Sequence, residues 1–421
     1  MDSWDILAKS LHIMSETSHS GTPAIRERQQ EIAAYLHYKG FTEKAIARVM
    51  GCATTTVNNR LKEAKETGLI VEEKRFDQCK MADPCRFDDL QLLNYTVLLG
   101  NELGKRSTRF HELTVLDSGG AGRSDSALKL RLHQFGHKVA SLTKHLFQRS
   151  TIVGVSWGAT LAAVVQALQS APSASGPKHR SITFVPTCGE PLEVRRRENS
   201  SSFLAAELDR CVNGTLDNSF SLSGIPAVIP LHFHNRQQHD FVIRRFFEDA
   251  TAYGDIFGKQ SVTGSERQRE KPLIDTVDTI LTSLGPVNKP WRMCGRELCE
   301  TGGVSKDRFT ALVMGDIAGI LIPRNEKIAA DPEFQGIEKL WTGIKRCHLE
   351  SVAKQAARNG PPGVVVVAIG ENKVVPLLAC IEQGLVNALF CDEDLARALA
   401  DRCGVKVTDQ AIRAYLKRFT S

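Results

Sequence analysis

Short apolar runs alternate with helical periodicity from about residue 109 onward, and this alternation constrains the fold most strongly. Runs of Val, Ile and Leu separated by helices are typical of a parallel sheet buried on both faces. Gly or Asp marks the ends of these runs, and open α/β sheets bind ligands beyond the carboxyl ends of their strands. We therefore predict an α/β domain whose strand ends converge on one pocket. The predicted strands cover residues 113–116, 150–155, 182–186, 311–314, 364–369 and 387–391, with a further strand at 226–231.

The composition is that of an ordinary globular protein with two or three domains. The 421 residues are 42% apolar and 24% charged, and the formal net charge of +6 permits nucleic-acid binding without arguing for it. No apolar run reaches the roughly 18 residues of a membrane span, and the first residues do not resemble a secretory signal. We therefore expect a cytoplasmic protein with no membrane partner. The eleven cysteines are scattered singly and are expected to be reduced core thiols.

Three short helices are predicted before the α/β pattern begins. The first covers residues 25–39, the second covers 43–50 after the N-cap Thr42, and the third covers 54–67. A glycine follows each helix, and an apolar strand or wing is expected at 69–71. Short helices joined by a tight glycine turn predict an all-α winged helix-turn-helix domain.

The third helix has an apolar inner face and a polar outer face. Val57, Leu61 and Ala64 recur at helical spacing and are expected to point inward. Residues at the start of such a helix face the base edges of the major groove, where Asn pairs with adenine and Arg with guanine. The predicted contacts to double-stranded operator DNA are Thr54, Thr55, Thr56, Asn58, Asn59, Arg60 and Lys62. A solvated helix in a protein-binding domain is the alternative interpretation.

These patterns divide the chain into four segments. Residues 1–24 are expected to be an N-terminal tail, and residues 25–76 the helix-turn-helix domain. Residues 77–108 contain an apolar patch that indicates a linker helix and oligomer contact. Residues 109–421 form the predicted effector-binding domain.

A glycine loop follows the strand predicted at 150–155 and leads directly into an apolar helix. Its glycines let the backbone approach a ligand closely, and the helix N-terminus offers N–H groups and partial positive charge. A phosphate or carboxylate is the ligand that such a loop favours. The residues expected to contribute are Gly154, Ser156, Trp157, Gly158 and Thr160. A plain strand-to-helix connection remains the alternative.

Several separated motifs together resemble the SorC family of bacterial sugar-responsive regulators, a SorC/DeoR-type group. The motifs occur in the family's order between about residues 40 and 400. They are Thr56-Val57, Leu61-Lys62-Glu63-Ala64, Gly68-Leu69-Ile70, Gly154-Val155-Ser156-Trp157-Gly158, Gly315-Asp316-Ile317-Ala318-Gly319, Gly370-Glu371-Asn372-Lys373, Gly384-Leu385-Val386-Asn387 and Asp392-Glu393.

The resemblance implies a Rossmann-like effector domain of the type found in sugar-phosphate isomerases and CoA-transferases. It also implies a phosphorylated sugar or polyol as effector and a homodimer or homotetramer. We expect no cofactor. Cys188, Gly189 and Glu190 match a second ligand loop of the family. Asp316 matches an acidic residue that meets sugar hydroxyls, and Lys373 matches a lysine that reaches the ligand. From the residues alone, Asp316 could instead cap a helix and Lys373 could be a solvated surface lysine.

Two other classes of protein and two other kinds of site are weighed against this interpretation. An isomerase or transferase with an appended helix-turn-helix is disfavoured, because no acidic catalytic cluster is evident. A DNA-binding protein without a ligand stays open. A metal site formed by His232, His234, His239 and Asp240 is not expected, because a pair of histidines rarely suffices to hold zinc. A metal site formed by Cys294, Cys299, Cys347 and His348 is not expected either, because no Cys-x-x-Cys pair supports it. The run Arg195-Arg196-Arg197 is a solvated face or a source of anion contacts.

Overall fold

The structure is a computed structural model in which the chain divides into two compact units. One unit contains the described residues of Met1–Ser118 and Phe390–Ser421, and the other contains those of Gly119–Leu389. The sequence pattern instead predicts a boundary near residue 108, and most of the predicted tail lies outside the described residues. The described residues are 23–38, 41–50, 52–72, 75–76, 92–119, 125–170, 181–192, 197–214, 217–231, 245–258, 271–287, 293–356, 360–408 and 411.

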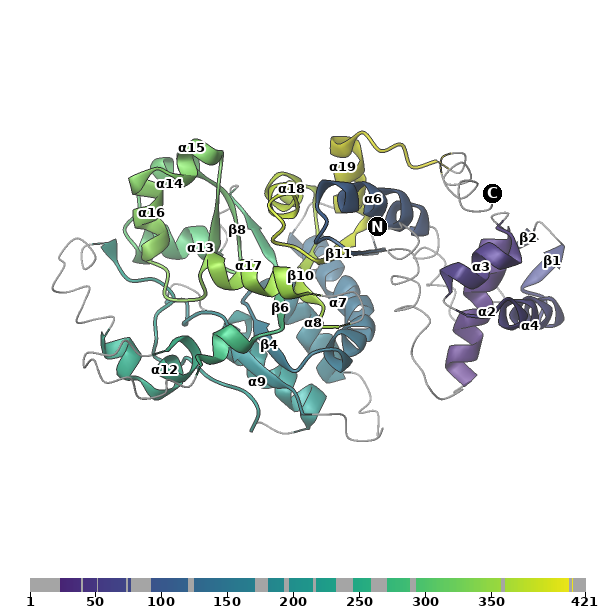
Figure 1. The fold of residues 1–421 in the computed structure, drawn as a ribbon, viewed down its shortest axis with the longest axis horizontal. Helices are drawn as coiled ribbons and strands as arrows, with labels where there is room; N and C mark the ends of the chain where they lie inside the picture. Colours follow the sequence, from purple (N-terminus) through teal and green to yellow (C-terminus); the bar gives the residue numbers. More distant parts are fainter. Residues whose placement is uncertain are drawn as a thin grey trace. The chain divides into compact units, whose positions relative to one another are not determined.

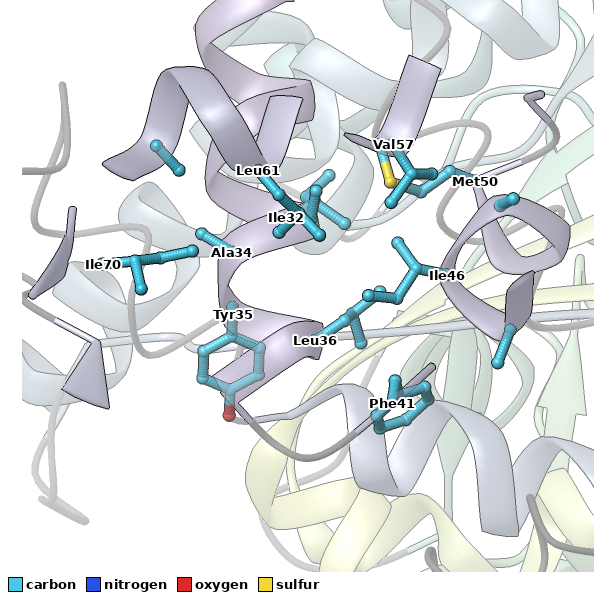
Figure 2. Close-up of a cluster of buried hydrophobic side chains, with 14 of the residues drawn as sticks. Ile32, Ala34, Tyr35, Leu36, Phe41, Ile46, Met50, Val57, Leu61 and Ile70 are labelled. Carbon is cyan, nitrogen blue, oxygen red and sulfur yellow. The ribbon is translucent and has the colours of Figure 1, made fainter. Parts of the chain in front are cut away.

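Three helices and a two-stranded sheet follow one another at the N-terminal end of the first unit (Figure 1). Their apolar side chains meet in one cluster, where Figure 2 shows Ile32, Ile46, Val57 and Leu61 pointing toward one another. These four side chains are at most 5% exposed. The elements are α2 (Pro23–Tyr38), α3 (Glu43–Val49), α4 (Thr54–Glu66), β1 (Ile70–Glu72) and β2 (Arg75–Phe76). The three predicted helices are thus confirmed, with ends that differ by one or two residues.

Local signals explain where these helices begin and end. Thr42 caps α3, because its Oγ1 accepts the backbone N–H of Ala45 at 3.3 Å. Gly68, directly after the last turn of α4, adopts a left-handed φ of 74°, which glycine tolerates without strain. β1 and β2 pair antiparallel, with Ile70 opposite Phe76 and Glu72 opposite Arg75. The short strand predicted at 69–71 is therefore confirmed as β1.

Two further helices belong to the first unit, α6 (Leu93–Arg106) and α19 (Glu393–Cys403), and they pack against each other. α6 lies inside the segment predicted as a linker helix, and its Leu93 and Val97 join the apolar cluster of α2 to α4. Asp392 caps α19 by accepting the backbone N–H of Leu395 at 3.1 Å.

The main sheet has six strands in the order β3-β11-β10-β6-β4-β5. The pairs β10–β6, β6–β4 and β4–β5 are parallel, with Val364 opposite Ile280 and Gly154 opposite Val185. All six residues of β10 are buried, as expected for a strand covered on both faces. The strands are β3 (Glu112–Leu116), β4 (Ile152–Val155), β5 (Thr183–Pro186), β6 (Thr279–Thr282), β10 (Gly363–Ala368) and β11 (Ala388–Asp392). The predicted parallel sheet is confirmed, and β6 is a strand that the sequence pattern did not indicate.

Helices pack against this sheet within the second unit (Figure 1). α7 packs on α8 at Gly136, where an added Cβ would lie 2.6 Å from the carbonyl oxygen of Ala163. α9 contacts β4 and β5, and α17 contacts β10 and β6. The α-helices whose bounds lie within the described residues of this unit are α7 (Asp125–Gln148), α8 (Ala159–Ser170), α9 (Ser201–Asn213), α12 (Thr251–Phe257), α13 (Met293–Arg296), α14 (Lys306–Leu312), α15 (Glu326–Ala329), α16 (Pro332–Lys339), α17 (Arg346–Gln355) and α18 (Val374–Glu382).

A second, antiparallel sheet corrects one of the strand predictions. It contains β7 (Leu284–Pro286), β8 (Val313–Ile317) and β9 (Ile320–Pro323). Of the run predicted as a strand at 311–314, Val313 and Met314 lie in β8 and so belong to this sheet and not to the parallel one, whereas Ala311 and Leu312 are the last residues of α14. Ala318 and Gly319 form the two-residue turn between β8 and β9 with φ of 53° and 82°, as tight hairpins require. The strand predicted at 226–231 is wrong, because only isolated bridges form there.

Candidate functional site

The glycine loop after β4 is hydrogen-bonded to the neighbouring strand β6. Ser156 is fully buried, and its hydroxyl donates to Thr282 Oγ1 at 2.9 Å while its backbone N–H donates to the Leu281 carbonyl at 3.0 Å. Gly154, inside β4, leaves room for the neighbouring strand, because a Cβ there would lie 3.2 Å from Ile280 Cγ1. The Ser156 hydroxyl therefore bonds within the protein rather than facing an open pocket.

The following residues turn the chain from β4 into α8. Gly158 has a φ of 135°, and its N–H donates to the Asn199 carbonyl at 3.1 Å. A Cβ at this position would approach Ser283 Oγ to 2.6 Å, so the backbone passes close to the end of β6. Thr160 is buried in the first turn of α8. The loop has the strand-turn-helix geometry that the sequence predicts, and two of its backbone N–H groups donate to residues outside it, one in β6 and one at the end of the 3-10 helix Arg197–Asn199.

Trp157 packs edge-on against Trp341, a residue that the sequence analysis did not single out. The ring centroids are 5.0 Å apart at an interplanar angle of 66°, and the two residues are 4% and 3% exposed. Both belong to an apolar cluster that also contains Cys188 and Cys294. Gly319 makes room for the Trp341 ring, because a Cβ there would lie 1.8 Å from a ring carbon. Trp341 Nε1 is buried and has no hydrogen-bond partner.

The loop after β5 carries Cys188, Gly189 and Glu190. Cys188 is fully buried, and burial raises the pKa of its thiol far above the usual range. Gly189 allows a close approach, because a Cβ there would lie 2.4 Å from the Ile225 carbonyl oxygen. The backbone of Glu190 bonds to Ile225 and Ala227 at 2.6 and 2.9 Å. One carboxylate oxygen of Glu190, Oε1, is buried without a hydrogen-bond partner.

Asp316 is the most perturbed carboxyl group near these loops. It lies in β8 and is 9% exposed, and burial raises its pKa to about 7. Two interactions oppose that rise: the N–H of Gly319, which donates to Oδ2 at 3.2 Å, and the positive charge of Lys373. Asp316 therefore lies in a strand and accepts a hydrogen bond from the adjoining turn, so it does not cap a helix. Gly285 lies against it, because a Cβ there would meet Oδ1 at 2.2 Å.

Four of the predicted residues are close enough to influence one another electrostatically. The charges of Glu190 and Asp316 both raise the pKa of Cys188, and Lys373 acts on Asp316. Lys373 is half-buried at the end of a short 3-10 helix, Glu371–Lys373, after β10. The loops after β5, β8 and β10 thus meet, and Trp157 joins them through its cluster with Cys188. We refer to Trp157, Glu190, Asp316, Trp341 and Lys373 as the strand-end site.

The residues predicted to contact DNA all lie on α4. Thr54, Thr55, Asn58, Asn59 and Lys62 are exposed, and Thr56 is half-buried. Lys62 Nζ lies 4.0 Å from Glu66 Oε1 in a surface ion pair. These side chains form a polar surface on the helix, opposite its buried residues.

Arg60 differs from its neighbours on α4 because its guanidinium group donates hydrogen bonds to side chains of α2 and α4. It donates to Gln29 Oε1 at 3.2 Å and to Glu63 Oε2 at 2.9 Å, and its side chain is 17% exposed. Glu63 also accepts from Arg26 on α2, and this hydrogen bond contributes most to lowering the pKa of Glu63. In this arrangement Arg60 connects α4 to α2.

The alternative metal sites gain no support from the described residues. Those residues contain no group of three or more His, Cys, Asp or Glu side chains that could hold a metal ion. His232, His234, His239 and Asp240 lie outside the described part of the chain, as do Arg195 and Arg196. Among the described helices, none combines the length and apolarity needed to cross a bilayer.

Comparison with known proteins supports the resemblance inferred from the motifs. No protein-family model matches the chain. The sorbitol operon regulator of Klebsiella pneumoniae is 26% identical over 179 residues, which are 42% of this chain and 49% of that protein. The chain therefore matches about half the length of this curated relative.

Two solved structures share the fold. The crystal structure of the full-length sorbitol operon regulator SorC from Klebsiella pneumoniae matches with a TM-score of 0.50 and 17% identity, over 88% of this chain and 97% of that one. A transcriptional regulator from Streptococcus pneumoniae TIGR4 matches with a TM-score of 0.50 and 15% identity, over 73% and 97% of the two chains. The predicted resemblance is confirmed: this chain is similar in sequence and in fold to the SorC/DeoR-type regulators.

Proposed function

We propose that this chain is a transcription regulator whose binding to operator DNA responds to a small sugar-like effector. Helices α2 to α4 and the β1–β2 hairpin would form a winged helix-turn-helix, with α4 in the major groove. The observation that carries the proposal is the polar outer surface of α4, where Thr55, Asn58, Asn59 and Lys62 are exposed above a buried apolar face. Asn and Lys are residue types that contact base edges and phosphates.

The strand-end site is the proposed location of the effector. Asp316 and Glu190 supply carboxylate oxygens that accept hydrogen bonds from a diol, and Lys373 supplies a cation for a phosphate or hydroxyl oxygen. The unpartnered Glu190 Oε1 and Trp341 Nε1 are a buried acceptor and a buried donor that such a ligand would satisfy. The proposed ligand is a phosphorylated sugar or polyol, in keeping with the name of the related sorbitol operon regulator.

The regulator is proposed to act as a homodimer or homotetramer. A two-fold symmetric dimer reads a pseudo-palindromic operator whose half-sites are about one helical turn, or a multiple of it, apart. Effector binding would favour one arrangement of the DNA-binding helices over another. The ratio of the effector's affinities for the two arrangements would limit how far operator affinity changes.

A polarization titration with labelled promoter DNA from beside the chain's own gene tests the DNA-binding half of the proposal. Asn59→Ala is expected to weaken specific binding by about 1–3 kcal/mol, the range of a lost base contact, at matched salt. The control is Gln166→Ala, which removes an exposed amide from α8 and should leave the isotherm unchanged. An unaltered isotherm for Asn59→Ala would show that this surface of α4 does not read bases.

A further inference from the structure

A cavity of about 790 Å³ opens beside Trp341, in a part of the second unit that none of the predicted site residues lines. Its walls come from β9, from α15 and α16, and from the start of α17. A volume of this size is within the range of about 300–1,000 Å³ that small-molecule sites occupy. The apolar residues of the wall include Ile320, Leu321, Phe334, Ile337, Trp341 and Ile344.

The same cavity carries more positive than negative charge. Lys339, Lys345 and Arg346 line it, together with the single carboxylate of Glu338. Arg346 is held in place, because its guanidinium donates to Gln383 Oε1 at 2.9 Å and to the Leu321 carbonyl at 3.4 Å. Lys345 donates to the Trp341 carbonyl. An arginine has more N–H donors than these two bonds use, so Arg346 can still meet an anion.

We propose that this cavity binds a small organic anion with an apolar body, such as a medium-chain or aromatic carboxylate. The apolar walls favour a hydrocarbon body, since burying apolar surface contributes about 25 cal/mol per Å². The cations favour an anionic head, and a guanidinium fits a carboxylate with two parallel hydrogen bonds. A sugar would gain less from the apolar side of this cavity, because it brings little apolar surface to bury against the Ile, Leu and Phe side chains. The inference does not depend on the proposed DNA-binding function.

The cavity shares two residues with the environment of the strand-end site. Trp341 lines the cavity and packs against Trp157, and Gly319 lines the cavity and donates its N–H to Asp316. A ligand in the cavity therefore rests against the indole ring that contacts the glycine loop. Its binding should alter the environment of Trp341, which makes tryptophan emission a second readout.

The test is isothermal titration of the full chain with octanoate and, separately, with octan-1-ol, which has the same hydrocarbon tail and no charge. Octanoate is expected to bind to a single site at least about ten-fold more tightly than octanol, and to shift the tryptophan emission. Arg346→Gln should lower the affinity for octanoate about ten-fold or more and leave the affinity for octanol unchanged. The matched control is Lys354→Gln, which removes an exposed cation from the same helix, α17, outside the cavity.

A second variant keeps the test decisive if Arg346→Gln does not fold. Ala329→Trp places a large ring at an exposed position on the cavity wall and is expected to block both probes. Equal affinities for octanoate and octanol, or unchanged octanoate binding by either variant, would overturn the proposal. So would the absence of any octanoate binding to the parent chain.

Discussion

Asp316 should make the protein less stable as the pH rises through the weakly acidic range. Burial raises the pKa of this carboxyl group from 3.8 to about 7 in the native chain. Between these values the folded protein holds a proton that the unfolded chain has lost, so rising pH favours unfolding. Each unit of pKa difference corresponds to about 1.4 kcal/mol, so the full loss is about 4 kcal/mol and is complete above about pH 7.

The substitution Asp316→Asn removes this titration while it keeps the shape and one acceptor oxygen of the side chain. The free energies of unfolding of variant and parent, measured with urea, should therefore differ more at about pH 8 than at about pH 5. Between these pH values the variant should gain about 3 kcal/mol in stability relative to the parent. Asp307→Asn, on an exposed position of the same unit, is the matched control and should show no such change. If the free energies of unfolding of Asp316→Asn and parent differ by the same amount at both pH values, folding does not raise the pKa of Asp316.

Three other substitutions test separate contacts in the two units. Lys373→Ala is expected to abolish the response to effector in a polarization assay and to leave operator affinity nearly intact, whereas an unchanged response would exclude Lys373 from the site. Gly319→Ala should lower the melting temperature, with a destabilisation of about 2 kcal/mol, because the position has a φ of 82° and adjoins the Trp341 ring. Thr42→Ala removes the cap of α3 and should cost about 1 kcal/mol in urea unfolding; no loss would show that the cap contributes nothing.

The elements that sequence reasoning predicted well are those specified by local signals. The cap Thr42, the terminal Gly68 and the helical spacing of Val57 and Leu61 lie within a few residues of the features they determine. The long Val run of β10 likewise predicts a strand buried on both faces, because few other structures accommodate it.

The elements that were missed depend on weak or distant signals. The turn between β8 and β9 is Ala318-Gly319, which lacks the Asn or Asp that usually identifies a two-residue hairpin turn. β6 is only four residues long and contains two threonines, so its apolar pattern is faint. The predicted strand at 226–231 has a suitable composition, but its partners are single bridges to distant segments.

In the candidate site too, the sequence predicts the local features and misses the long-range contacts. The sequence indicates which strand ends carry Glu190, Asp316 and Lys373, because each follows or lies in an apolar run. It does not indicate that Trp341 packs on Trp157, or that the Ser156 hydroxyl donates to Thr282, because both contacts join segments more than a hundred residues apart. Contacts of this kind arise from tertiary packing and have no local pattern.

We propose that a ligand at the strand-end site and operator DNA on α4 each change the affinity of the chain for the other. Linkage requires that the two effects be equal in size. The most direct measurement is the affinity of the full chain for promoter DNA with and without sorbitol 6-phosphate, glucose 6-phosphate or sorbitol, followed by the affinity for the active compound with and without DNA. We expect one compound to change the affinity for DNA by some factor, and DNA to change the affinity for that compound by the same factor. DNA binding that none of a wide panel of sugars and sugar phosphates alters would contradict it.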